Sequence, residues 1–173
     1  MRTVLLFTLL SRVALASSVL PLDVPALTHA ASDVVRAQVT SVRCAWTDDK
    51  RRLVTLVEVE VLESWKGAAK RRLTVVQPGG ELDGIGQRVF GVAPLALGEE
   101  VVLFLERQGQ FHRTVGLAQG VYRVKRSAAE ARAVPAELQG LSLVGAKGRP
   151  LQPRLDVPLE TLKDAVRREV ERE

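Results

Sequence analysis

Two long stretches near the start of the chain alternate between apolar and polar residues. Between Val34 and Trp46 the apolar residues Val35, Ala37 and Val39 share one face, and after Thr40-Ser41 the apolar set moves to Val42, Cys44 and Trp46. Alternation of period two predicts a β-strand, and a change of parity inside it predicts a β-bulge that bends the strand. A polar loop at 47–51 leads to a return strand over 53–65, in which inward valines alternate with outward glutamates. The two stretches therefore predict a long, bent hairpin.

Shorter apolar runs predict further strands in the rest of the chain. The run Val101–Leu105 is apolar at every position, which is typical of a strand buried on both faces. The segment from Pro78 to Gly91 is rich in glycine, and we expect a long loop with one short strand there. Strands outside the long hairpin are predicted at 73–77, 88–90, 101–105, 111–115 and 120–125, with another hairpin over 138–144.

Two segments have helical rather than alternating spacing. Residues 25–31 form a short amphipathic turn, after which Ser32-Asp33 can cap the turn or reverse the chain before the first strand. Asp156-Val157-Pro158 predicts the start of a C-terminal helix, because proline is favoured in the first helical turn. That helix has a single apolar stripe and is expected to pack on the strands; the stripe consists of Leu159, Leu162, Ala165, Val166 and Val170.

Together these elements predict one mainly β domain, for which 173 residues are a suitable length. We expect a five- to six-stranded antiparallel OB-like β-barrel with a C-terminal α-helix, because long bent strands need a curved sheet. The predicted organisation is a signal peptide at 1–16, an N-terminal lead-in at 17–31, the barrel at 32–126, an irregular segment at 127–156 and the helix at 157–173.

The first sixteen residues have the order of features found in secretory signals. A positive start at Met1-Arg2 is followed by an apolar run and by Val13-Ala14-Leu15-Ala16, which predicts cleavage between Ala16 and Ser17. A membrane anchor or a buried N-terminal strand are the alternatives, but the apolar run is shorter than the roughly 20 residues that a membrane span needs. We therefore expect a secreted or periplasmic protein with no transmembrane segment after signal removal. Loss of Arg2 and Arg12 lowers the net charge from +5 to +3.

The chemistry-bearing residues are few. A single cysteine excludes an internal disulfide, and two histidines with one thiol cannot form a zinc site without carboxylates. Cys44 lies on the apolar face of its strand with Val42 and Trp46 and is expected to be a buried, inert thiol. His29 and His112 are expected to be surface or hydrogen-bonded residues. No nucleophile, base or metal-ligand set comes together in the sequence or in the predicted fold. The sequence therefore predicts no catalytic residue, no metal, no cofactor and no enzymatic activity.

Two further patterns point to binding rather than catalysis. The cluster Pro78–Gly86 lacks the Gly-Lys-Ser/Thr ending of a phosphate loop and is interpreted as a structural loop that can reach a partner. Region 107–154 has nine basic residues against Glu130 and Glu137, and a solvated face is the alternative to a binding surface. With an aromatic content of only 4%, nucleic acid is disfavoured. The candidate polyanion-binding residues are Arg113, Arg123, Lys125 and Arg126.

Three segments carry a resemblance to a known family. Ser32–Val39, Val57–Gly67 and Gly98–Leu105 resemble the netrin-like, OB-type barrel of tissue inhibitors of metalloproteinases, and also a group of exported bacterial domains with the same Lys-Gly pattern. The resemblance covers about residues 32–125 and implies the barrel fold. The inhibitors chelate the protease zinc through a cysteine at the mature N-terminus, where this chain has Ser17.

Two functions are consistent with these features. The first is an exported, non-catalytic protein-binding module for an unknown protein partner, with protease modulation as one form of it. The alternative is an envelope polyanion-binding protein that holds an anionic glycan or a lipid headgroup through the basic region 107–154. Binding that depends on arginine contacts to phosphate or sulfate weakens steeply as the salt concentration rises, which distinguishes the two.

Overall fold

The long hairpin predicted from the alternation is present in the computed structural model, which describes residues 18–68, 70–140, 142–143 and 154–173. Its strands are β2 (Asp33–Trp46) and β3 (Leu53–Lys66), which pair antiparallel. The register skips a residue between Val39 and Ser41, so the bulge expected from the parity change is confirmed. At two more register shifts the extra residue lies on β3, at Trp65 and at Leu62, and bends that strand.

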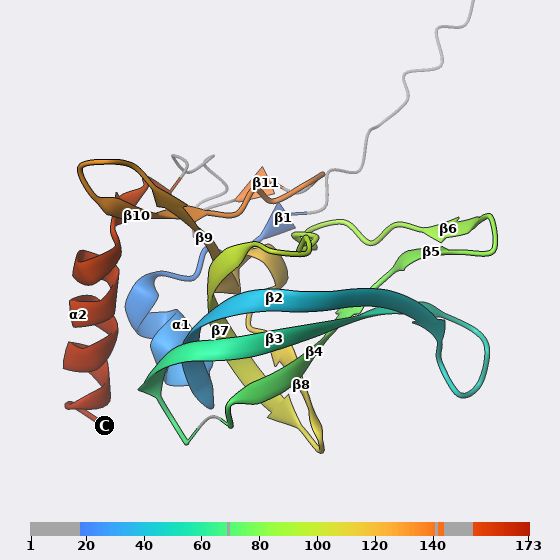
Figure 1. Cartoon of the computed structure of the whole chain (residues 1–173), viewed down its shortest axis with the longest axis horizontal. Helices are drawn as coiled ribbons and strands as arrows, with labels where there is room; N and C mark the ends of the chain where they lie inside the picture. The colour runs from blue at the N-terminus through green and yellow to red at the C-terminus, as the bar shows by residue number, and fades with distance from the viewer. Residues whose placement is uncertain (1–17, 69, 141, 144–153) are drawn as a thin grey trace, which may run out of the picture.

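β2 and β3 belong to an eight-stranded sheet in the order β12-β10-β9-β7-β2-β3-β4-β8. β8 (Phe111–Thr114) also pairs with β7 (Glu100–Gln108), so β7, β2, β3, β4 and β8 form a ring of five strands (Figure 1). β4 (Arg72–Pro78) meets β8 in a parallel contact between Val75 and His112, whereas the other pairs of the ring are antiparallel. The mainly β class and the C-terminal helix are confirmed.

The sheet continues beyond the ring in a segment that was predicted to be irregular. β9 (Val121–Arg126) follows the 3-10 helix η1 (Leu117–Gly120) and pairs with β10 (Ala131–Pro135), which in turn pairs with β12 (Val157–Pro158). The segment 127–156, expected to be irregular apart from a hairpin over 138–144, therefore contains the strand β10. Alanines occupy β10 where a strand normally shows large apolar residues, so its alternation carries little signal.

Two local predictions are also corrected. The short strand expected at 88–90 is absent, and the strands of that loop are β5 (Gly80–Leu82) and β6 (Ile85–Gln87), joined by Asp83-Gly84. Both turn residues have positive φ, which an Asp-Gly pair accepts readily. The hairpin expected over 138–144 is wrong as well, because β11 (Ser142–Leu143) pairs in parallel with β1 (Ser18–Val19); residues 141 and 144 lie outside the described chain.

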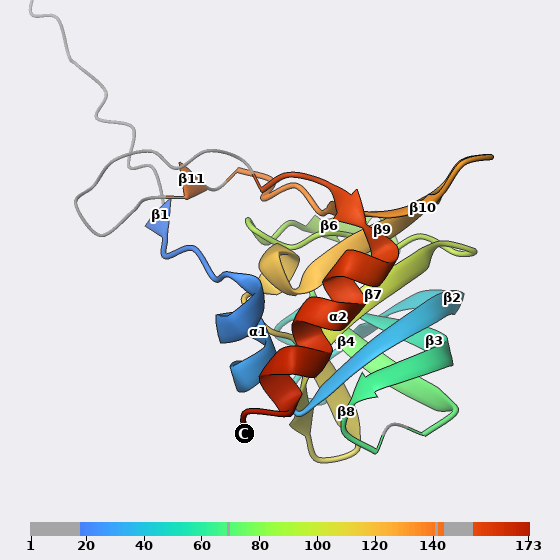
Figure 2. The ribbon, with the colours of Figure 1, turned by 90° about the vertical axis from the view of Figure 1, so that its left-hand side faces the viewer.

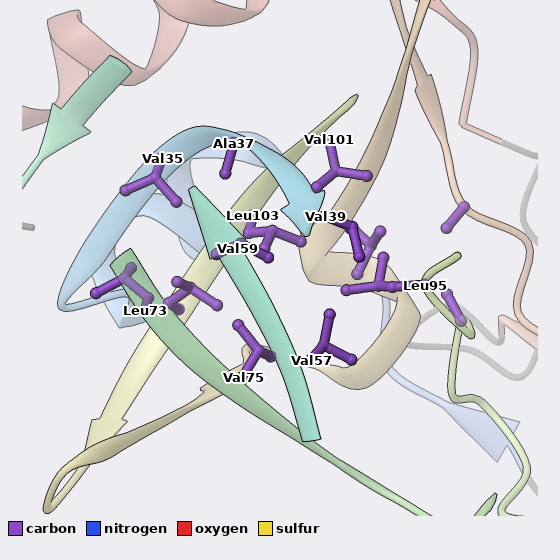
Figure 3. Packing of buried hydrophobic residues seen from close by; sticks show 14 of the residues in the cluster. Val35, Ala37, Val39, Val57, Val59, Leu73, Val75, Leu95, Val101 and Leu103 are labelled. Atoms are coloured by element: carbon purple, nitrogen blue, oxygen red, sulfur yellow. The ribbon is translucent and has the colours of Figure 1, made fainter. Parts of the chain in front are cut away.

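Alternate residues of β7 face two different cores. One core fills the ring, and most of its valines and leucines come from β2, β3, β4 and β7 (Figure 3). Val101, Leu103 and Leu105 point into this core, whereas Val102 and Phe104 point to the second core outside the ring. All five side chains are fully buried, which confirms that this is the most buried run. The second core also contains Leu27, Val34, Trp65, Tyr122, Leu159, Leu162 and Val166.

Two helices cover the second core. Figure 2 shows α1 (Val24–Ala30) beside α2 (Leu159–Val170), both lying across the sheet. The side chain of Asp23 caps the N-terminus of α1 by accepting a hydrogen bond from the Ala26 N–H at 2.9 Å. α2 packs on the sheet as expected, but Val157 and Pro158 form β12, so the helix begins at Leu159.

Candidate functional site

The outer half of the β2–β3 hairpin extends beyond the ring. β2 pairs with β7 only from Asp33 to Gln38, and from Ser41 onwards its strand partner is β3 alone within the described chain. This part of the hairpin, residues 41–56, is called the outer ribbon here. In Figure 1 the outer ribbon and the β5–β6 hairpin extend to the same side of the molecule.

Glycines allow β5 to lie directly on the outer ribbon. A Cβ atom at Gly80 would be 2.6 Å from the Cys44 Sγ and 2.8 Å from the Thr55 Oγ1, so only glycine fits there without a shift. The Thr55 hydroxyl donates a hydrogen bond to the Gly79 carbonyl at 2.8 Å, and the Leu53 N–H donates to the Gln87 side chain at 2.8 Å. The glycine cluster therefore has a packing role against the ribbon.

An apolar groove of about 380 Å³ lies between the outer ribbon and the segment that follows β6. Trp46 has the same parity in β2 as Val42 and Cys44 and faces the same side of the strand. Two side chains of this face are partly exposed, Val42 by 39% and Trp46 by 37%, and Phe90 after β6 is exposed by 58%. The apolar side chains that line the groove are Val42, Pro78, Val89, Val92, Pro94 and Leu95.

Cys44 is a groove residue rather than a core residue. The expectation of a buried thiol is wrong, because Cys44 is only half-buried, with its Sγ 3.5 Å from the Thr55 Oγ1. The strand pattern correctly identified an apolar face after the bulge. It could not show that the ring ends at the bulge and leaves that face uncovered.

The four candidate polyanion-binding residues do not form one free patch. Arg123 donates to Glu99 at 3.2 Å, and Arg126 donates to both oxygens of Glu100 at 2.7 and 2.9 Å. Arg113 lies opposite Glu106 of β7, whereas Arg123 lies opposite Val101 near the other end of that strand. Lys125, on β9, forms no ion pair within the described residues.

Other basic side chains of region 107–154 are also used inside the protein. Arg132 binds Asp156 at 2.8 Å and also pairs with Glu130. Arg154 lies 5.0 Å from the centre of the Tyr122 ring and donates to the Gln119 carbonyl at 2.6 Å. Much of the described positive charge of this region is therefore neutralised or bound internally, which the sequence pattern could not reveal.

A buried charge cluster lies where β2 begins. Asp33 is fully buried, and its two carboxylate oxygens accept hydrogen bonds from the Arg107 Nη2 at 3.1 and 2.9 Å. The Ser32 hydroxyl donates to the same carboxylate at 3.1 Å, and the His112 Nε2 lies 3.6 Å from it. Sequence reasoning missed this cluster, because its members come from β2, β7 and β8 and share no motif.

The two histidines differ in their surroundings. His29 is exposed on α1, with its Nδ1 3.5 Å from a Glu173 carboxylate oxygen. His112 is buried, and its Nδ1 makes no hydrogen bond of acceptable geometry within the described chain, although the Thr74 backbone lies near enough to favour protonation. Burial lowers the pKa of His112 below its ordinary value; Asp33 opposes this effect, and the charges of Arg107 and Lys70 add to it.

The lowered pKa of His112 predicts a pH dependence of stability. The unfolded chain binds this proton more readily than the folded chain, so the free energy of unfolding should fall as pH is lowered through about 6.5. Replacing His112 by glutamine should flatten this slope. Urea unfolding followed by tryptophan fluorescence between about pH 5 and 8 measures it; an unchanged slope in His112→Gln would contradict the prediction. Burial raises the pKa values of Glu63 and Glu100, but hydrogen bonds and charges from basic partners outweigh it and lower both pKa values overall, so these groups titrate at lower pH.

Comparison with known proteins finds no matching family model, curated protein or solved structure. In the described part of the chain, no three His, Cys, Asp or Glu side chains come together as a metal site requires. The same residues include no helix with the length and apolar character needed to cross a membrane. The predicted cleavage site between Ala16 and Ser17 lies outside the described residues, as do Lys147 and Arg149 of the basic region.

Proposed function

We propose that the protein is a non-catalytic protein-binding module whose binding surface is the groove beside the outer ribbon. The observation that carries this proposal is the groove of about 380 Å³, whose lining includes the partly exposed Val42. Trp46, on the same face of β2, and Phe90, next to the lining residue Val89, are partly exposed as well. Apolar surface concentrated at one place is typical of interaction sites, and tryptophan is enriched among residues that dominate binding energy.

The backbone of the outer ribbon favours an extended segment of a partner as the occupant. From Ser41 to Trp46, the edge of β2 away from β3 has no backbone hydrogen-bond partner within the described chain. An open strand edge accepts a further strand by main-chain hydrogen bonds, and neighbouring apolar pockets then select its side chains. The groove next to Val42 and Cys44 would provide such a pocket.

The finer fold assignment and the location are part of the same proposal. We propose that the five-stranded ring is an OB-like barrel, since its strands in chain order pair as 1-2-3-5-4-1, the Greek-key arrangement of that fold. The netrin-like resemblance supports the barrel assignment. We also propose that the protein is exported through the signal at 1–16. The inhibitors chelate the protease zinc through a cysteine at the mature N-terminus, where this chain has Ser17. A protease modulator of this kind would therefore need another contact surface, and we propose the groove.

Position-specific crosslinking tests the binding surface. A photo-crosslinking phenylalanine analogue at Trp46 should form an adduct with one protein of the envelope or the culture medium. The control position is Leu62, which is also partly exposed on β3 but lies near the strand's other end. An excess of wild-type protein without the crosslinker should compete for the partner and suppress the adduct. The same excess of the Val42→Asp/Phe90→Asp variant should not suppress it, because charges on this surface oppose apolar contact.

The same experiment separates the two functions. An adduct that survives high salt supports protein binding, since a packed apolar interface is only weakly screened. Equal adducts from Trp46 and Leu62, or no adduct at low and high salt, would refute the groove as the binding surface. Heparin binding at physiological salt that is lost when Arg113, Arg123, Lys125 and Arg126 become alanine would favour the polyanion alternative.

A further inference from the structure

A second pocket, of about 330 Å³, lies at the opposite end of β3 from the outer ribbon. It is formed where the segment after β3 meets the turn between β7 and β8, near the parallel contact between Val75 and His112. Its charged or polar lining residues are Lys70, Arg72, Thr74, Arg107, Gln110 and His112. No acidic side chain is among the described residues that line it.

The pocket has an excess of positive charge. Lys70 and Arg72 form no ion pair with any described residue, although arginines elsewhere, such as Arg36 and Arg126, bind Glu100. Asp33, buried behind the pocket, offsets the charge of Arg107 alone. Glu60 lies opposite Arg72 in the β3–β4 register but is paired with Arg71. Lys70, Arg72 and Arg107 therefore exceed the carboxylate of Asp33 by two charges. The effect of Lys70 and Arg107 on the pKa of His112 agrees with their closeness to it.

Arg107 is held in a fixed orientation for a ligand. Its Nη2 binds both oxygens of Asp33, while its Nε and Nη1 make no hydrogen bond within the described chain. The Arg107 side chain is about half exposed and can therefore be reached by a ligand from solvent. Gly109 of the nearby turn has open space around it, because a Cβ there would meet no described atom within 4 Å. An arginine anchored on one side loses little further freedom on binding an anion.

We propose that this pocket binds a doubly charged tetrahedral oxyanion, namely the phosphate group of a monoester or free phosphate. Phosphate monoesters carry nearly two negative charges at neutral pH, which matches the charge excess. Arginine binds phosphate oxygens through paired N–H groups, and lysine contributes a mobile point charge. The site is independent of the groove and would add ligand binding to a protein-binding module.

Calorimetric titration with inorganic phosphate and with glucose 6-phosphate tests the proposal. Lys70→Gln/Arg72→Gln should weaken phosphate binding by about tenfold or more, because it removes two charge-assisted contacts. Lys50→Gln/Arg51→Gln is the matched control, since it removes two charges from the exposed loop at the far end of the hairpin. That control should bind phosphate as the wild type does.

A second readout is the imidazole of His112, followed by NMR. Bound phosphate should raise the pKa of His112, because a dianion counters Lys70 and Arg107 there; Asp33 is the acidic group already facing it. Vesicles of phosphatidic acid in phosphatidylcholine identify the source: sedimentation with them indicates a lipid headgroup, and binding of soluble esters alone indicates a free ligand.

Either source supports the proposal, and three results would overturn it. The first is no phosphate binding at millimolar concentration. The second is an equal loss of affinity in both double variants, which would indicate general charge attraction. The third is binding of heparin without binding of phosphate or its monoesters, which would indicate a polyanion surface instead.

Discussion

Replacing Gly67 by alanine should lower the free energy of unfolding by about 3 kcal/mol or more. Gly67 has φ of +79°, and a Cβ there would lie 2.5 Å from both the Ser32 carbonyl oxygen and the Asp33 Oδ1. The first neighbour is backbone, and the second is a buried carboxylate held by Arg107. Neither can move without breaking hydrogen bonds at the start of β2. Urea unfolding followed by tryptophan fluorescence measures the loss.

Gly84→Ala is the matched control for this prediction. Gly84 has a similar φ of +76°, but a Cβ there would meet no described atom within 4 Å. Its substitution should cost about 1 kcal/mol, the backbone strain alone. The difference between the two variants thus measures the close approach of Gly67 to Asp33. Equal losses of unfolding free energy in the two variants would show that the close approach of Asp33 adds no cost beyond the backbone strain.

The Phe104→Ala variant should lose about 4 kcal/mol of unfolding free energy. Phe104 is fully buried in the second core, with its ring centre 5.9 Å from that of Tyr122. Removing it leaves a cavity between the sheet and the two helices, and the regular strand β7 limits how far the backbone can collapse into it. Chemical denaturation at constant pH, with the slope against denaturant checked for two-state behaviour, measures the loss.

Phe90→Ala is the corresponding control, because Phe90 is the same residue type with 58% exposure. We expect a change within about 0.5 kcal/mol for this variant. A Phe104→Ala loss as small as that of Phe90→Ala would mean that the second core contributes little to stability. The pair therefore separates burial from residue type.

Much of the fold could be predicted from the sequence, because period and parity are local signals. They located β2, its bulge, β3, β7 and α2. β10 escaped detection because its alternating positions are partly alanine, and the β5–β6 hairpin escaped because its strands are only three residues each. Its Asp83-Gly84 turn was the one available signal.

The candidate sites could be predicted far less well, because they depend on residues that are distant in sequence. The groove exists because the ring ends at the bulge, and strand periodicity does not indicate where a ring closes. Arg126 is neutralised by Glu100, 26 residues earlier, and Arg107 by Asp33, 74 residues earlier. A count of basic residues along the chain therefore predicted a polyanion-binding surface in region 107–154. In the folded protein, carboxylates from other strands neutralise part of that charge.

The place of β7 in the ring also affects the rate and order of folding. β2 pairs with β7 across more than 60 residues, so the ring cannot close until most of the chain has been synthesised. Contacts of such long sequence separation slow folding, since the loop entropy is lost before the contacts form. The β2–β3 hairpin can form early, but the Asp33–Gln38 edge of β2 then remains unpaired until β7 is available. Until β7 pairs with it, this edge is the segment most open to mispairing with another chain.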